Sequence, residues 1–459
     1  MCSFLSYKIY KKGKRRAAVI LLLAVTFLSC QSNAPDFERE VGQVAAFAEM
    51  VVAGVKPLAL SAPLPPAEMD DFEPLAREAA AAYGVAVFRE SDLIQTDLFP
   101  TDVAAGKDVL LLCDTLTKRA YDSLRADRGM LVAADAYTGA ARRQIARRFG
   151  RLLGYTPQGI NRLLAEQTDF RTLADFGVNA TNLFWYYRDR MAAKEFYTTI
   201  LGLKVVAEYD NSTILQIAQD AYLTLVDDGK GMHTADEPKS VALALLTRQL
   251  PQWWNYLEEQ SVNVKYTYKP REGNAHDGFV IVDPEGYLLE FEVFKQHPEN
   301  EPAMPLLQRA PDLPVSPTVA NAPGGLAFHG TVAWLYYQDV LAMENFVEQT
   351  LGFPLVIDQG WAKVYPASQT GFIGLVDERR GMNDYTEEKA VNVSFWMDDL
   401  DGWWGYAKKE QPFSLRQEEL TEDAEGRYRA FVGFDPEGYF LEFDQFLDHP
   451  ANANLPVVE

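Results

Sequence analysis

Hydrophobic residues recur along the C-terminal two-thirds of the chain at spacings that alternate between those of strands and those of helices. The aromatic run 182–187 predicts a strand, and apolar positions four residues apart over 192–200 predict a helix. Strand-like runs follow at 203–206, 212–217 and 221–226. After a polar loop the same order returns, with a strand at 241–246, a helix at 251–259 and strands at 262–266, 278–282 and 287–293. The pattern therefore predicts a βαβββ module twice in succession.

This whole pattern is repeated about 150 positions later. The repeated segments are Tyr186-Tyr187 and Tyr336-Tyr337, Leu201-Gly202 and Leu351-Gly352, Gly231-Met232 and Gly381-Met382, and Trp253-Trp254 and Trp403-Trp404. Matches in one order and nearly one register indicate a tandem duplication of a whole domain, because solenoid repeats are much shorter. We expect domains at 178–296 and 326–448, with a proline-rich extended linker at 297–325 between them and a tail at 449–459.

Residues 55–177 precede the repeats and have a different pattern. Apolar runs alternate with helical stretches, at 55–60, 66–83, 85–88, 108–113, 115–124 and 140–153. This alternation predicts a small α/β or helix-rich domain. The segment has no phosphate-binding glycine pattern around Gly106-Lys107. The sequence assigns this domain no chemistry, and we expect it to serve as a spacer or docking platform between an N-terminal lipid and the repeats.

Residues 1–29 have the three segments of a secretory signal peptide. Basic residues are followed by the apolar run 17–28, which is too short to span a bilayer as a helix, and by a small residue. The stretch 26–30 resembles a bacterial lipobox, which implies cleavage before Cys30 and lipidation of Cys30. Since Gln31 follows the cysteine, sorting to the outer membrane is expected if the cell has one. We predict a lipid-anchored cell-envelope protein in which 30–54 is a tether and helical lead-in; an ordinary cleaved signal and an uncleaved anchor stay open.

The chain is strongly acidic, with 43 Lys and Arg residues against 65 Asp and Glu residues and a net charge of −22. Such a charge repels nucleic acid and anionic lipid surfaces. We therefore expect no nucleic-acid partner, and membrane attachment only through the N-terminal lipid. Cys113 would be the one free thiol of the mature chain, and its place at the end of an apolar run favours a buried structural residue over a nucleophile.

Three sequence features together resemble the vicinal oxygen chelate (VOC) superfamily, which includes glyoxalase I, extradiol dioxygenases and bleomycin-binding proteins. They are a strand that ends at Asp189, a helix that closes in Phe196-Tyr197 and Leu201-Gly202-Leu203, and a terminal Asp-Pro-Glu-Gly segment from Asp283 to Glu290. The resemblance implies an α+β fold with two tandem VOC domains. In each domain two βαβββ modules would pair to form a cup that holds a ligand or a metal.

The resemblance also implies where a metal would bind, because metal-using members place His, Gln or Glu on four cup-facing strands. The corresponding residues are Asn182, Thr224, Ala242 and Glu290 in the first copy and Val332, Gly374, Asn392 and Glu442 in the second. A divalent ion needs about three or four suitable donors, so one carboxylate in each copy predicts that no metal cofactor is bound. A non-standard divalent-metal site that uses His329 or His276 stays open.

Side chains two apart along a strand share a face, which identifies the residues expected inside each cup. The first copy would contribute Asn182, Phe184, Tyr186, Ala244, Glu290 and Glu292, and the second copy Trp334, Tyr336, Asn392, Ser394, Trp396, Glu442 and Asp444. Aromatic walls with a few polar groups are typical of small-molecule sites, so we predict a small-molecule ligand. Carboxylates among aromatic rings suit a cationic or a polyhydroxylated molecule, and the choice stays open. Alternatively the carboxylates pair with Arg or Lys and the aromatic rings are core. In each doubled tryptophan we expect one buried and one partly exposed ring.

Three functions compete. The first is a lipid-anchored, metal-independent protein that binds a small molecule. The second is a glyoxalase-like or dioxygenase-like enzyme that has an unusual metal set or uses Glu290 or Glu442 as general base. The third is a structural envelope protein whose cups are filled by their own aromatic residues. The missing ligands favour the first function over the second, and the carboxylates retained in both copies weaken the third.

Overall fold

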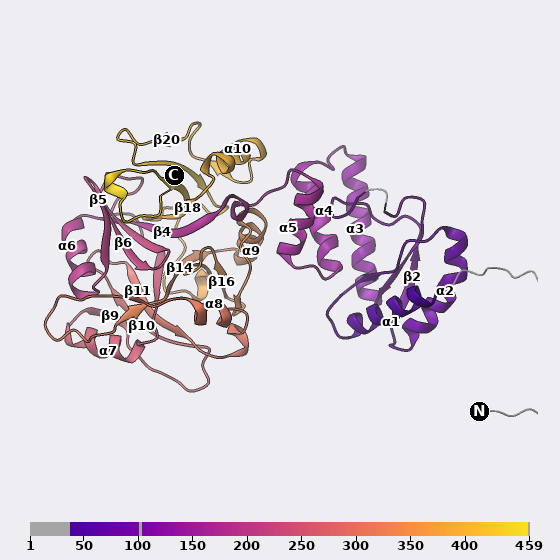
Figure 1. The fold of residues 1–459 in the computed structure, drawn as a ribbon, viewed down its shortest axis with the longest axis horizontal. Coiled ribbons are helices and arrows are strands. Elements are labelled where there is room, and N and C mark those ends of the chain that lie inside the picture. The colour runs from indigo at the N-terminus through magenta and orange to yellow at the C-terminus, as the bar shows by residue number, and fades with distance from the viewer. Residues whose placement is uncertain (1–36, 101–102, 458–459) are drawn as a thin grey trace, which may run out of the picture.

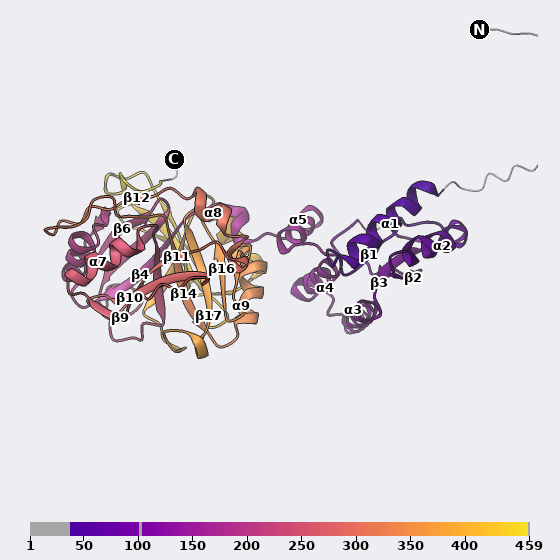
Figure 2. The same ribbon diagram turned by 90° about the horizontal axis from the view of Figure 1, so that it is seen from below.

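The computed structural model describes residues 37–100 and 103–457, which form two parts (Figure 1). An N-terminal domain lies beside a larger body formed by the repeats, and the view from below shows the same separation (Figure 2). No helix within the described ranges is long and apolar enough to span a membrane. The predicted signal peptide and Cys30 lie outside the described residues.

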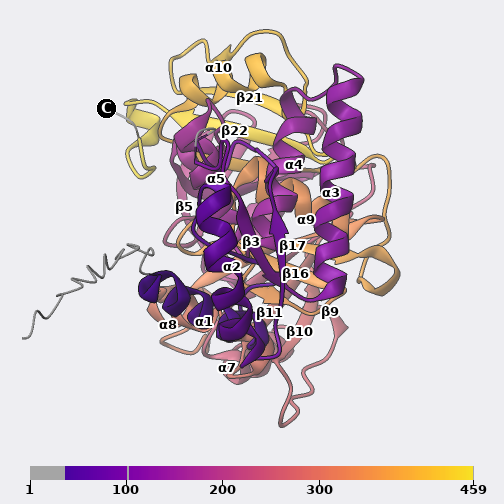
Figure 3. The same cartoon turned by 90° about the vertical axis from the view of Figure 1, so that its right-hand side faces the viewer.

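The N-terminal domain is a small antiparallel sheet between two layers of helices, and it lies in front of the repeats in Figure 3. The sheet has the order β1 (Ala59–Leu60), β3 (Val109–Cys113) and β2 (Ala86–Glu90). Leu110 and Leu112 share a core with the first layer, α1 (Glu38–Val52) and α2 (Pro66–Ala81). Leu111 and Cys113 share another core with the second layer, α3 (Thr115–Ala133), α4 (Gly139–Leu152) and α5 (Pro157–Gln167). This alternation explains why every residue of β3 is buried.

The predicted α/β or helix-rich domain is confirmed, but the sequence analysis did not predict α5. Two residues, Thr156 and Pro157, mark the start of this helix in the sequence. Thr156 caps it by accepting a hydrogen bond from the Gly159 N–H group at 3.1 Å, and Pro157 occupies its first turn. A Thr-Pro pair is a common helix start.

The repeats form two large sheets, one of nine strands and one of eight. The first sheet has the order β19 (Ser414–Leu415), β21 (Tyr428–Phe434), β22 (Phe440–Phe446), β18 (Val391–Met397), β4 (Val178–Tyr187), β7 (Ala221–Asp227), β6 (Ser212–Ala218) and β5 (Lys204–Tyr209), and β20 (Thr421–Glu422) also pairs with β21. The second has the order β15 (Ile357–Asp358), β16 (Ala362–Pro366), β17 (Gly371–Asp377), β14 (Gly330–Tyr337), β8 (Val241–Leu246), β11 (Leu288–Phe294), β10 (His276–Val282) and β9 (Asn263–Tyr266). The helices of the four modules are α6 (Arg190–Glu195), α7 (Leu250–Glu259), α9 (Val340–Phe346) and α10 (Leu400–Glu410).

Each sheet takes one module from each copy. At the centre of the first sheet β4 pairs antiparallel with β18, and at the centre of the second β8 pairs antiparallel with β14. The α+β fold built from paired βαβββ modules is confirmed, but the expectation that each cup is formed within one copy is wrong. The periodicity of a strand determines which face is buried, whereas it leaves the hydrogen-bonding partner along the strand edge undetermined.

Equivalent residues of the two copies occupy equivalent places. Asp189 and Asp339 cap α6 and α9, and each accepts a backbone N–H three residues on at 2.9 Å. Trp253 and Trp403 are fully buried in α7 and α10, while the second tryptophan of each pair is only partly buried, as predicted. These matches confirm the duplication at the level of side chains.

The segment between the copies is more structured than predicted. Instead of a purely extended linker, it contains a 3-10 turn at Pro298–Asn300, the helix α8 (Met304–Arg309) and the strand β12 (Leu313–Pro314), which pairs with β13 (Ala327–Phe328). Two of the prolines lie at helix starts, where their missing N–H groups cost nothing. Proline content alone was therefore a poor guide here.

One core lies behind both sheets. Leu183, Trp185 and Tyr187 of β4 belong to this core together with residues of β8, β14 and β18 and the buried faces of the four module helices. The alternate side chains, such as Asn182 and Tyr186, face the opposite way. The opposite faces of the two sheets are the concave sites that we call the first cup, on the sheet of β4 and β18, and the second cup, on the sheet of β8 and β14.

Candidate functional site

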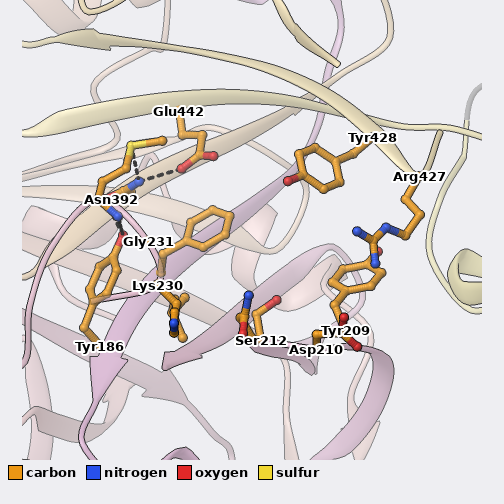
Figure 4. Close-up of a pocket in the computed structure, with 14 residues that line it drawn as sticks. Tyr186, Tyr209, Asp210, Ser212, Lys230, Gly231, Asn392, Arg427, Tyr428 and Glu442 are labelled. Carbon is orange, nitrogen blue, oxygen red and sulfur yellow. Dashed lines mark hydrogen bonds between the residues drawn. The ribbon is translucent and has the colours of Figure 1, made fainter. Parts of the chain in front are cut away.

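The first cup contains a cavity of about 400 Å³. Strands β4, β18 and β22 contribute Tyr186, Asn392 and Glu442 to its lining, and loops near residues 210, 231 and 427 form its rim (Figure 4). Both copies therefore contribute to the cavity. Its volume lies within the range of small-molecule sites.

A row of hydrogen bonds crosses the floor of this cavity. The Tyr186 hydroxyl donates to Asn392 Oδ1 at 3.0 Å, and Asn392 Nδ2 donates to Glu442 Oε2 at 2.6 Å (Figure 4). The alternation of β4, β18 and β22 brings these three side chains to one face. Asn392 is thereby fixed in one orientation between a donor and an acceptor.

Two carboxyl groups lie together on the cup-facing side of β22. Glu442 and Asp444 are two residues apart and both are buried, and Ser394 Oγ donates to Asp444 Oδ2 at 2.6 Å. Burial raises the pKa of Glu442 to about 7. Burial, together with the charge of Glu442, raises the pKa of Asp444 well above its ordinary value. Both carboxyl groups therefore retain their protons to a higher pH than exposed carboxyl groups do.

The rim of the first cup carries charged and aromatic side chains. Arg427 is ion-paired with Asp423 at 2.8 Å, and its guanidinium group lies 5.0 Å from the centre of the Tyr209 ring. Exposed Lys230 and the carboxyl of Asp210 also line the opening. The cavity thus presents mixed charge at its mouth and hydrogen-bonding groups at its floor.

The residues at the superfamily's metal positions do not fit a metal centre in the first cup. They are Asn182, Thr224, Asn392 and Glu442. The oxygen of Asn182 already accepts from Thr224 Oγ1 at 3.0 Å, and that of Asn392 accepts from Tyr186. Across the described ranges no group of three His, Cys, Asp or Glu side chains could hold an ion. One carboxylate beside two occupied amides falls short of a transition-metal site.

The second cup is much smaller, with a cavity of about 90 Å³. Its four corresponding positions are Ala242, Val332, Gly374 and Glu290, of which only Glu290 is polar. Trp334 fills the space over Gly374, where an added Cβ would lie 2.1 Å from the indole ring. Burial raises the pKa of Glu290 to about 7. These positions likewise do not fit a metal.

The predicted site residues are divided between the cups differently from the prediction. Asn182, Phe184 and Tyr186 lie with Asn392, Ser394, Trp396 and Glu442, whereas Trp334 and Tyr336 lie with Glu290. Phe184, Tyr186, Asn392 and Glu442 line the larger cavity. Trp396 stacks on Tyr222 at 4.1 Å, so that it forms a wall behind the site. Asn182 and Ser394 are buried beneath the cavity surface.

Sequence reasoning missed Lys230 and Arg427. His276, which the sequence left open as a metal ligand, begins β10 and lines the second cup. The repeated Gly-Met pair was an available signal for the cups. A Cβ on Gly231 would lie 2.6 Å from Tyr186, and one on Gly381 would lie 2.4 Å from Tyr336, so each glycine makes room for a cup-facing tyrosine.

Solved structures with a similar arrangement include glyoxalase I from Zea mays, at 12% identity over 58% of this chain and 92% of that chain, with a TM-score of 0.41. A putative dioxygenase from Bacillus subtilis is 13% identical over 63% of this chain and 92% of that chain, with a TM-score of 0.43. A glyoxalase/bleomycin resistance protein/dioxygenase from Alicyclobacillus acidocaldarius is 21% identical over 25% of this chain and 91% of that chain, with a TM-score of 0.21. A comparison with curated proteins gave no match.

The family comparison agrees with the resemblance seen in the sequence. The match covers residues 183–291, which include the second half of β4 and most of β11. The chain therefore contains a domain of the Glyoxalase/Bleomycin resistance protein/Dioxygenase superfamily, that is, of the VOC superfamily.

Proposed function

We propose that this chain is a lipid-anchored cell-envelope protein whose first cup binds a small cationic or polyhydroxylated molecule without a metal. The observation that carries this proposal is the row formed by Tyr186, Asn392 and Glu442 at the floor of a cavity of about 400 Å³. A buried polar row that faces open space suits a ligand rich in hydrogen-bonding groups. The second cup has no such row and little space.

The chemistry of Glu442 supports this class of ligand. Neither Glu442 nor Asp444 forms an ion pair among the described residues, although both are buried. A ligand hydroxyl group can donate a hydrogen bond to the Glu442 carboxylate. A ligand ammonium group can form an ion pair with the ionised carboxylate. The alternative in which these carboxyls serve only to neutralise Arg or Lys is correspondingly weaker.

The proposal is tested by the thermal stability of the purified protein in EDTA with glycerol, glucose, choline and spermidine as probes. A bound probe raises the melting temperature as its concentration rises above the Kd. Glu442→Gln should reduce this shift, while Glu290→Gln, at the equivalent position of the other cup, should leave it unchanged. Equal shifts in all three proteins would place the probe elsewhere and contradict the proposal.

A second candidate is an enzyme in which Glu442 acts as general base. It is favoured by one observation, a carboxyl group with a pKa of about 7 at the floor of an open cavity. General bases work best with a pKa near the working pH. This candidate requires turnover that persists in EDTA, increases as Glu442 ionises and is lost in Glu442→Gln.

A further inference from the structure

Helix α4 carries five arginines, and one of them lacks an acidic partner. Four form ion pairs: Arg142 with Asp97, Arg143 with Glu410 at 3.5 Å, Arg148 with Asp127 at 2.7 Å, and Arg151 with Glu348 at 3.9 Å. Arg147 pairs with no carboxylate in the described part of the chain.

Arg147 is also the most buried member of this group, with 6% of its surface exposed. Its guanidinium group lies 4.6 Å from the centre of the Phe170 ring and donates one long hydrogen bond, 3.3 Å, to the Gln349 carbonyl oxygen. Its Nε has no hydrogen-bond partner in the part of the chain that the structure describes. A buried charge without a counter-charge is costly, and it becomes favourable only when an anion pairs with it.

Arg147 faces a groove of about 460 Å³ between the N-terminal domain and the repeats. The N-terminal side presents α4 and the segment 170–171, and the other side presents Gln349, Thr350 and the end of α10. Figure 1 shows α5 next to α9, and the ion pair of Arg143 with Glu410 joins α4 to α10. The groove is separate from both cups and shares no lining residue with them.

The groove is locally positive in a chain whose net charge is −22. Three guanidinium groups line it, those of Arg143, Arg147 and Arg171, against the single carboxylate of Glu410, which pairs with Arg143. Among the described residues the guanidinium group of Arg171 donates only to the backbone oxygens of Ala165 and Phe170. Within residues 37–100 and 103–457, two of the three guanidinium groups therefore have no counter-ion.

We propose that this interdomain groove is a binding site for a small oxyanion, a phosphate or carboxylate group, with Arg147 as its principal ligand and Arg171 as the second. Guanidinium groups bind both oxyanions through paired N–H donors. A bound anion would contact the N-terminal domain directly and would lie against Gln349 and Tyr406 of the repeats. The N-terminal domain thereby gains a role, since ligand binding would strengthen its attachment to the VOC domains. This inference does not rest on the function proposed for the first cup.

Calorimetric titration of the full-length protein in detergent tests the proposal, with inorganic phosphate and succinate as probes and sodium chloride at matched ionic strength as reference. We expect saturable binding of one probe at one site. Binding of phosphate alone would identify a phosphoryl ligand, and binding of succinate alone a carboxylate ligand. Arg147→Gln should weaken binding at least about tenfold, Arg147→Lys should weaken it less, and Arg148→Gln, whose arginine is paired with Asp127, should bind like wild type.

The melting temperature without added anion separates binding from a structural role. If Arg147 is held for an anion, Arg147→Gln should be as stable as wild type or more stable in sodium chloride, because an uncompensated buried charge is removed. Glu442→Gln should bind the anion as tightly as wild type, because Glu442 lies in the first cup and not in the groove. Failure of the first-cup proposal would therefore leave the anion affinity of the groove unchanged. The proposal is overturned if neither probe binds saturably, or if Arg147→Gln binds the anion as tightly as Arg148→Gln.

Discussion

The hydroxyl group of Tyr287 donates a 2.7 Å hydrogen bond to the carbonyl oxygen of Ala390, a residue of the other copy. The same hydroxyl accepts the N–H of Tyr186 at 2.9 Å. Tyr439 makes the reciprocal link, because its hydroxyl donates to the Ser240 carbonyl oxygen at 2.6 Å. Tyr287 of the first copy therefore anchors the residue that directly precedes β18, and Tyr439 of the second copy anchors the residue that directly precedes β8.

Removal of this link should destabilise the repeats. Tyr287→Phe leaves the Ala390 carbonyl and the Tyr186 N–H group unpaired in a buried place, which should lower the free energy of unfolding by about 1–3 kcal/mol. Urea unfolding followed by circular dichroism measures the loss. Tyr266→Phe is the control, since that side chain is 50% exposed, and its effect should stay within about 0.5 kcal/mol. Similar values for the two variants would show that the link contributes nothing.

The second cup should not tolerate a side chain at Gly374. Gly374→Ala would force its Cβ into the ring of Trp334, and we expect a loss of about 1–3 kcal/mol from overpacking. The matched control is Gly405→Ala in α10, where a Cβ meets nothing within 4 Å. That variant should gain about 0.5–1 kcal/mol from helix propensity. The opposite order of stabilities would show that Trp334 does not occupy the space above Gly374.

Stability should fall with rising pH through the ionisation of Glu442. In the unfolded chain this carboxyl has a pKa of about 4.3, whereas in the folded chain the value is about 7. The folded state therefore binds more protons between these values, and the contribution to stability is complete below about pH 4 and lost as the pH rises through about 7. The buried histidines His233, His276 and His329 act in the opposite direction, because their pKa values are lowered by burial.

Comparison of wild type with Glu442→Gln isolates the interacting pair Glu442 and Asp444 from the histidines, because the histidine contributions are common to both proteins. The variant cannot ionise at this position. Its free energy of unfolding relative to wild type should therefore increase between about pH 5 and about pH 8, by on the order of 1–3 kcal/mol. Denaturant unfolding at both pH values provides the measurement. Parallel pH profiles would mean that Glu442 titrates in the folded protein as it does in the unfolded chain.

Removal of metal should leave the protein unchanged. Neither cup offers the donors of a transition-metal centre, so we expect no stoichiometric zinc, iron, nickel or manganese after dialysis and no change in melting temperature with EDTA. Elemental analysis of the purified protein checks the first point. Retained metal together with an activity that chelation abolishes would instead favour the enzymatic function.

Cys30→Ser should abolish lipid labelling and release the protein from the membrane fraction. The expectation comes from the order of basic, apolar and small residues before Cys30. Cys113→Ala is the control, because Cys113 is buried in β3 and burial raises the pKa of its thiol to about 11, which makes it unreactive. A Cys30→Ser protein that stays membrane-bound and unprocessed would show that residues 1–29 are an anchor.

Local features of the fold could be predicted from the sequence, whereas the pairing of modules could not. The strand that leads to Asp189 and the single buried ring in each tryptophan pair depend on neighbours within a few residues, and both were predicted. The pairing of β4 with β18 depends on strand edges far apart in the chain. Pairing β4 with β8 would bury the same alternate residues, so that hydrophobic patterning cannot distinguish the two arrangements.

The candidate site shows the same division. Alternation along strands identified Tyr186, Asn392 and Glu442, since a side chain on a strand can point only to one of two faces. It could not identify Lys230 or Arg427, which line the mouth of the cavity. Lys230 lies in the loop after β7, and Arg427 directly precedes β21. The direction of a loop side chain depends on tertiary contacts, and the sequence pattern contains no information about these.

The exchange of modules between copies makes the repeats resemble a symmetric dimer fused into one polypeptide. In a dimer of identical chains a substitution such as glycine at position 374 would appear in both sites at once, so the two sites would have to change together. In the single chain different residues form the two cups, so that a substitution in one cup leaves the other unchanged. The second cup could therefore be filled by Trp334 while the first cup retained its polar floor. The second cup now serves as a structural support for the first.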